Sequence, residues 1–233
     1  MTQTIAITGA TGQLGRLATA ALKTRAPDAH LVALVRDPAK AADLGIEARA
    51  FDYHAKDSLP AALKGVDVLV LVSSSDFNDR AGQHRNVIDA AKEAGVKRVV
   101  YTSILKGDAS PMILAGDHIA TEEALKASGI PATILRNGWY TENYTGSIAG
   151  VLQSGMVAGA NASAQITPAA RADFAEAVAV ARAMPKSTSL TRPDVATSTL
   201  LGFTSRCTMR RGRPSKSTAE CACSRPSQTA RAT

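Results

Sequence analysis

A glycine-rich turn near the N-terminus constrains this chain more than any other feature. Gly9, Gly12 and Gly15 form a GxxGxxG pattern. The pattern comes directly after an apolar, strand-like segment at 4–8 and directly before a segment with helical spacing at 14–26. In such a place the first glycine permits a tight turn, the second lets the backbone approach a pyrophosphate, and the third permits close helix–strand packing. The pattern predicts a dinucleotide-binding turn, with an ordinary strand–helix turn as the alternative.

Short apolar segments alternate with helical segments through the first 135 residues. We predict strands at 4–8, 30–35, 48–51, 66–72, 99–102 and 131–135, with helical segments between them at 14–26, 38–44, 59–63, 86–94 and 118–128. Strands that are apolar on both faces are typical of a parallel sheet covered by helices on each side. We therefore predict an α/β protein, a Rossmann-like doubly wound parallel sheet with a small, incomplete substrate lobe.

Composition divides the chain into unequal parts. The chain has 233 residues, is 45% hydrophobic and has a net charge of +7, which excludes a wholly disordered protein. The segment 185–233 contains nine basic and two acidic residues and all three cysteines, so it carries the whole net charge and 1–184 is neutral. We predict a dinucleotide-binding domain at 1–135, a partial substrate lobe at 136–184 and a basic low-complexity tail at 185–233.

The end of the second predicted strand bears on the choice of cofactor. Arg36 follows that strand, and Lys40 lies one helical turn further on. A guanidinium suits the 2′-phosphate of NADP, whereas an acidic residue there would bind the ribose of NAD. These residues favour NADP(H), although Asp37 leaves NAD(H) open and a solvated basic face is the alternative for Arg36 and Lys40.

Two further loops are expected to face the cofactor. Asp52 follows the third strand, where it could accept from the adenine amino group or serve as a turn residue. Ser73 and Ser74 follow the fourth strand, where it would pass the ribose, although serine is common in any loop. The complete predicted set of cofactor-binding residues is Gly9, Thr11, Gly12, Gln13, Leu14, Gly15, Arg36, Lys40, Asp52, Ser73 and Ser74.

Several short motifs together resemble one family. They are TGATGQLG at 8–15, VRDP at 35–38, YTS at 101–103, HIATEEAL at 118–125 and LRNGWYTENY at 135–144. With them the chain, from about residue 2 to about 184, resembles the NmrA-like atypical short-chain dehydrogenases, in particular the NAD(P)H:quinone oxidoreductases and triphenylmethane reductases. The segment 170–175 is similar to the family's arginine–aspartate segment, which opens a helix.

The usual catalytic dyad of short-chain dehydrogenases is missing. In 1–184 no tyrosine is followed four residues later by lysine. His118 and Glu122 stand at i and i+4 where the family would place such a helix. The resemblance favours a position for this pair near the nicotinamide, whereas a hydrogen bond on the helix surface is the alternative. A metal site would need more ligands than these two, and we predict no metal.

The missing dyad has a chemical meaning. A quinone or a cationic dye accepts hydride without a tuned acid, so the protein mainly has to align donor and acceptor. We therefore predict hydride transfer from NAD(P)H to quinones or similar electron-poor aromatics, with Asn137, Tyr140 and His118 as candidate catalytic residues. Trp139, Tyr140 and Tyr144 could face an aromatic substrate or pack within the small lobe. The alternative function is a non-catalytic, NADP-sensing regulator.

The segment 185–233 departs from the family. It is rich in Ser, Thr, Arg and Pro, and its cysteines, at 207, 221 and 223, have no zinc-site spacing. We interpret it as disordered or as the product of a frameshift that replaced a lobe expected to close the acceptor pocket, so we expect weak turnover. A basic tail that binds nucleic acid is the alternative, but aromatic residues do not interleave with its charges. We expect a cytoplasmic protein with no nucleic-acid or membrane partner.

Overall fold

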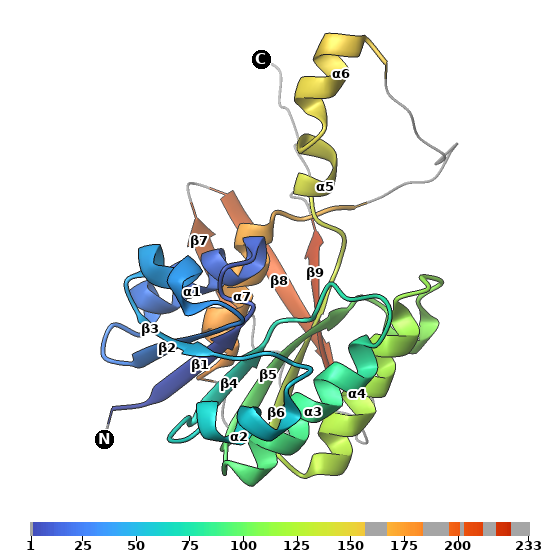
Figure 1. The fold of residues 1–233 in the computed structure, drawn as a ribbon. Coiled ribbons are helices and arrows are strands. Elements are labelled where there is room, and N and C mark those ends of the chain that lie inside the picture. The colour runs from blue at the N-terminus through green and yellow to red at the C-terminus, as the bar shows by residue number, and fades with distance from the viewer. Residues whose placement is uncertain (1, 157–166, 184–195, 201–202, 212–217, 225–233) are drawn as a thin grey trace.

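The fold centres on a parallel β-sheet between two layers of helices (Figure 1). The computed structural model describes residues 2–156, 167–183, 196–200, 203–211 and 218–224. The six parallel strands have the order β3-β2-β1-β4-β5-β6. Their bounds are β1 Thr4–Thr8, β2 His30–Val35, β3 Glu47–Ala50, β4 Val68–Leu71, β5 Arg98–Ile104 and β6 Ala132–Asn137. This is the doubly wound Rossmann order, and it confirms the predicted fold class.

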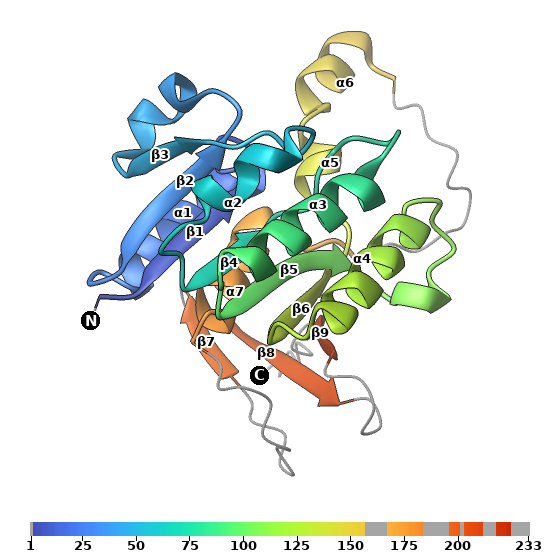
Figure 2. The ribbon, with the colours of Figure 1, turned by 60° about the horizontal axis from the view of Figure 1, so that its bottom comes forward.

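The helices divide between the two faces of the sheet. α1 (Gln13–Arg25) and α7 (Arg171–Ala181) pack together on one face, and α2 (Leu59–Ala62), α3 (Arg80–Glu93) and α4 (Ala115–Ser128) cover the other (Figure 2). Short 3₁₀ helices occupy Pro38–Leu44, Lys56–Ser58 and Gly107–Ala109. Most predicted elements lie within a few residues of their observed bounds. α3 begins six residues before its apolar stripe, because Asp79 caps it by accepting from the backbone N–H of Gly82.

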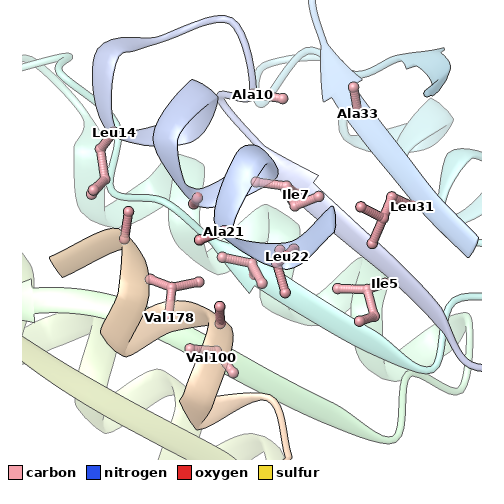
Figure 3. Close-up of a cluster of buried hydrophobic side chains, with 14 of the residues drawn as sticks. Ile5, Ile7, Ala10, Leu14, Ala21, Leu22, Leu31, Ala33, Val100 and Val178 are labelled. Atoms are coloured by element: carbon pink, nitrogen blue, oxygen red, sulfur yellow. The ribbon is translucent and has the colours of Figure 1, made fainter. Parts of the chain in front are cut away.

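Side chains that alternate along the strands build the two halves of the core. Ile5 and Ile7 of β1 belong to the same buried cluster as Leu22 of α1 and Val178 of α7 (Figure 3). Ala6, between them, belongs to the opposite cluster together with residues of α3 and α4. Successive strand residues point to opposite faces, so a strand covered on both sides is apolar throughout. This packing explains why the sequences of the central strands are continuously apolar.

The segment after β6 has two distinct parts. α5 (Glu142–Thr145) and α6 (Ile148–Ser154) form an arm that projects from the body (Figures 1 and 2). α7 then returns to the sheet, and its Phe174 and Val178 belong to the main core beside α1. The part of the predicted small lobe that contains α7 therefore packs as a layer of the Rossmann-like domain.

Three strands lie within the predicted tail. β9 (Thr218–Ser224) pairs parallel with β6, β8 (Phe203–Arg211) pairs antiparallel with β9, and β7 (Ala196–Leu200) pairs antiparallel with β8. The sequence analysis predicts none of these strands. The other residues of 185–233 lie outside the described residues, and the origin of this segment in another reading frame stays a prediction. In the described part of the chain, no helix is long and apolar enough to span a membrane.

Candidate functional site

A large cleft of about 1140 Å³ opens at the carboxyl edge of the parallel sheet. This edge is where ligands bind in open α/β sheets, close to the point where the strand order reverses between β1 and β4. Ten of the eleven predicted cofactor-binding residues line the cleft: Gly9, Thr11, Gly12, Gln13, Leu14, Gly15, Arg36, Asp52, Ser73 and Ser74. The predicted catalytic candidates His118, Asn137 and Tyr140 line it too.

The glycine turn forms one end of the cleft. Gly9 has a φ of +59°, in the left-handed region, and its carbonyl oxygen accepts a 2.9 Å hydrogen bond from the N–H of Gly12. Gly12 is the N-cap of α1 and offers no side chain to the free N–H groups of the first helical turn, which also contains no acidic residue. These N–H groups and the positive end of the helix dipole suit a phosphate. A dinucleotide therefore fits this end of the cleft.

The side chain of Arg16 stabilises the glycine turn. Its Nε donates to the carbonyl oxygen of Thr11 at 3.1 Å, and its guanidinium pairs with Asp43. The same guanidinium donates to the carbonyl oxygen of Lys40 at 3.5 Å. The sequence analysis did not single out Arg16. Its position one residue after the third glycine is the only signal that could have suggested this role.

The residues after β2 have different surroundings. The side chain of Arg36 is exposed along the wall of the cleft. The carboxylate of Asp37 instead caps the following 3₁₀ helix by accepting from the N–H of Ala39 at 3.1 Å. Lys40 lies in that helix and is not among the described residues that line the cleft. The structure thus brings Arg36, but not Lys40, to the predicted cofactor site.

The loops after β3 and β4 also line the cleft. Asp52 accepts from the N–H of His54 at 3.1 Å, so it serves as a turn residue while it also lines the cleft. The N–H of Ser73 donates to the hydroxyl of Thr102 at 2.9 Å, and the hydroxyl of Ser74 donates to Gln83 Oε1 at 2.9 Å. The serine loop is therefore anchored to β5 and α3.

Asn137, at the end of β6, stands at the far end of the cleft. Its Nδ2 donates to the Tyr140 hydroxyl at 3.5 Å, and its backbone carbonyl accepts from the N–H of Leu105 at 2.8 Å. The Tyr140 ring packs edge-on against Phe174, with the Arg171 guanidinium 4.7 Å from the ring centroid on its face. Burial raises the pKa of Tyr140. Tyr140 therefore both packs and lines the cleft.

The other two predicted aromatic residues differ in position. Trp139 is about two-fifths exposed and lines the cleft beside Tyr140. Tyr144 is exposed to the same extent but lies on α5, outside the set of described residues that line the cleft.

His118 and Glu122 hydrogen-bond to different partners. The Nδ1 atom of His118 lies 2.7 Å from the hydroxyl of Tyr101, a buried residue of β5. Glu122 accepts from the Ser103 hydroxyl at 2.6 Å and from Arg136 at 2.8 and 3.0 Å. His118 lines the cleft, whereas Glu122 is not among the described residues that do. Across the described residues, no cluster of three or more His, Cys, Asp or Glu side chains is arranged to hold a metal ion.

Tyr101 and His84 are polar residues near the cleft to which the sequence analysis gave no role. His84 Nε2 accepts from the N–H of Ser74 at 3.0 Å, and its Nδ1 lies 2.9 Å from the Thr121 hydroxyl. Burial lowers the pKa of His84 to about 3. Tyr101 lies in the YTS motif that carried part of the resemblance, but nothing in the sequence indicated its partner.

Comparisons with known proteins agree with this geometry. Residues 9–185 match the model of a family described as NAD(P)H-binding. Quinone oxidoreductase 2 of Escherichia coli K12 is 52% identical over 178 residues, which are 75% of this chain and 62% of that protein. The chain thus spans less than two thirds of the length of this relative.

Solved structures show the same similarity. The Escherichia coli NADPH-dependent quinone oxidoreductase complexed with NADPH superposes with a TM-score of 0.73 at 50% identity, over 77% of this chain and 64% of that one. The Citrobacter sp. triphenylmethane reductase complexed with NADP(H) also has a TM-score of 0.73, at 36% identity, over 78% of this chain and 67% of that one.

Proposed function

This chain belongs to the NAD(P)H-binding family, and from that premise we propose that it transfers hydride from NADPH to quinones or similar electron-poor aromatics. The observation that carries the proposal is that one cleft is lined both by the glycine turn and by Asn137, Tyr140 and His118. The relatives named as quinone oxidoreductases support the choice of substrate class.

The chain's own groups suit NADPH. The free N–H groups at the start of α1 would hold the pyrophosphate, and the Arg36 guanidinium would pair with the 2′-phosphate. One oxygen of the Asp37 carboxylate caps the 3₁₀ helix, which directs this side chain towards the backbone N–H of Ala39. When bound, the cofactor would supply a hydride from C4 of its nicotinamide.

The far end of the cleft suits a flat, electron-poor acceptor. Trp139, Tyr140 and Met112 provide apolar and aromatic surface there, and Asn137 adds an amide. This mixture would orient an aromatic ring without supplying a strong acid, as a quinone requires. We place the reaction in the cytoplasm as part of the same proposal.

The test is oxidation of NADPH, followed at 340 nm, with a panel of quinones and one triphenylmethane dye. Turnover with at least one acceptor, and slower turnover with NADH, is expected. Tight NADPH binding with no turnover on any acceptor would instead favour the NADP-sensing regulator.

The C-terminal segment affects the expected rate. Because the chain matches its relatives only to about residue 185, we propose that it binds NADPH but turns quinones over slowly. The comparison is a version whose native reading frame is restored after residue 184, which should show a much higher kcat/KM. Equal kcat/KM for the two versions would contradict this part of the proposal.

A further inference from the structure

A buried tyrosine–histidine pair lies behind the acceptor end of the cleft. Tyr101 is fully buried on β5, and its hydroxyl lies 2.7 Å from Nδ1 of His118 on α4. Glu122, four residues after His118, does not serve as its partner, because Ser103 and Arg136 occupy the carboxylate. The phenol of Tyr101 is therefore the group that orients the His118 ring.

The surrounding hydrogen bonds bear on the direction in which the phenol proton points. The backbone N–H of Ser74 donates to Nε2 of His84, so the proton of this neutral imidazole is on Nδ1, which donates to the Thr121 hydroxyl. Thr121 in turn donates its own proton to the carbonyl oxygen of Asp117 at 2.8 Å. Thr121 and Ser73 also interact with the Tyr101 hydroxyl. Because the Thr121 proton is already used and Nδ1 of His118 lies only 2.7 Å from the phenol oxygen, we assign the phenol proton to the bond with Nδ1.

The other ring nitrogen of His118 faces the cleft. If Nδ1 accepts from Tyr101, the proton of the neutral imidazole is on Nε2. Nε2 has no hydrogen-bond partner among the described residues, yet it is not one of their buried unpaired atoms. Because Nε2 is accessible and His118 lines the cleft, we infer that this N–H points into the cleft. Burial lowers the pKa of His118 to about 4 and raises that of Tyr101, so both groups are neutral at pH 7.

We propose that Tyr101 is a positioning residue that holds His118 with its proton on Nε2, so that the neutral imidazole donates a hydrogen bond to the carbonyl oxygen of the acceptor. This inference rests on the proposed function. The hydride brings two electrons and one proton to the acceptor, and negative charge develops on its oxygen. The fixed N–H of His118 stabilises that charge, and a proton from water then completes the hydroquinone.

Tyr101→Phe tests the inference, because it removes the hydroxyl and keeps the buried ring. We expect kcat with a quinone to fall about tenfold or more, with the dissociation constant for NADPH within twofold of the parent. Tyr144→Phe is the matched control, since it removes a phenolic hydroxyl outside the described lining of the cleft, and it should leave kcat unchanged. An unchanged kcat in Tyr101→Phe would overturn the proposal.

A second measurement does not depend on turnover. The ¹⁵N shifts of the His118 ring should show the proton on Nε2 in the parent protein and a mixture of both tautomers in Tyr101→Phe. A proton on Nδ1 in the parent would overturn the proposal even if the enzyme is active. Absence of quinone turnover together with the expected tautomer would instead contradict the proposed function alone.

Two further variants test the donor role of His118 if Tyr101→Phe does not fold. His118→Gln retains an N–H donor of similar reach and should keep part of the parent's kcat, whereas His118→Phe should lose most of it. Equal kcat in these two variants would contradict a donor role for His118.

Discussion

Substitution of Gly15 by alanine should damage the glycine turn from within. A Cβ at this position would lie 2.1 Å from the carbonyl oxygen of Gly9 and 2.8 Å from the Cα of Ala10. Both are backbone atoms of the turn, so no side-chain rotation can relieve the contact. The turn and helix α1 would have to separate by about 0.9 Å for the oxygen to reach even 3.0 Å.

This displacement sets the expected magnitude. Overpacking of this kind lowers the free energy of unfolding by about 1–3 kcal/mol. The same shift moves the first-turn N–H groups of α1 away from a bound pyrophosphate. Loss of one charge-assisted hydrogen bond, worth about 1.5–3 kcal/mol, would weaken NADPH binding roughly tenfold to a hundredfold.

The assay combines urea unfolding with fluorescence titration of NADPH. Gly150→Ala in α6 is the matched control, because a Cβ there meets no heavy atom within 4 Å. The control should bind NADPH like the parent and gain at most about 1 kcal/mol of stability from the better helix former. If Gly15→Ala bound NADPH within twofold of the parent, the reasoning from the close approach would be refuted.

Three other variants probe the remaining parts of the site. Arg36→Ala should weaken NADPH binding by about ten- to a hundredfold and leave NADH binding unchanged, as measured by titration of both cofactors; an unchanged preference would exclude the 2′-phosphate contact. Asn137→Ala should lower quinone turnover while the NADPH dissociation constant stays within a few-fold, because Asn137 lies at the end of the cleft away from the glycine turn; steady-state kinetics beside a binding titration separates the two effects. His84→Gln tests the pH dependence of stability. Burial lowers the pKa of His84 from 6.5 to about 3, so between these pH values the unfolded chain binds more protons than the folded one. The contribution of His84 to the free energy of unfolding is therefore fully present above pH 6.5 and is lost as the pH falls towards 3. Urea unfolding at pH 7, 5.5 and 4.5 should show a shallower fall for the variant, and equal slopes would contradict the assignment.

The sequence alone was enough to predict the six parallel strands, most of the helices between them and part of the lining of the cleft. Apolar runs with a strand or helix period mark the sheet and its covering helices, because burial on two faces leaves a local pattern in the chain. The glycine turn and Arg36 could also be predicted as part of the cleft lining, because both lie within a few residues of the end of a strand. The same local argument predicted Lys40, but this residue lies in the 3₁₀ helix and is not among the described residues that line the cleft.

Only the tertiary structure decided which polar residues near the acceptor site form hydrogen bonds with one another. Tyr101 and His118 meet because β5 and α4 place them together, and His84 comes between Ser74 and Thr121 because α3 packs beside α4. None of these contacts leaves a periodic signal, since a hydrogen bond depends on two positions that the chain brings together from a distance.

Helix α7 shows the same limit for packing. Its apolar residues predict only that it is buried, whereas its place beside α1, about 150 residues earlier, follows from the space that the sheet leaves open on that face. Local patterns thus predicted the six parallel strands and most of the helices between them, and they indicated the glycine turn as a candidate phosphate site. The assembled sheet decided which side chains share the cleft, because only the order of its strands sets which loops become neighbours.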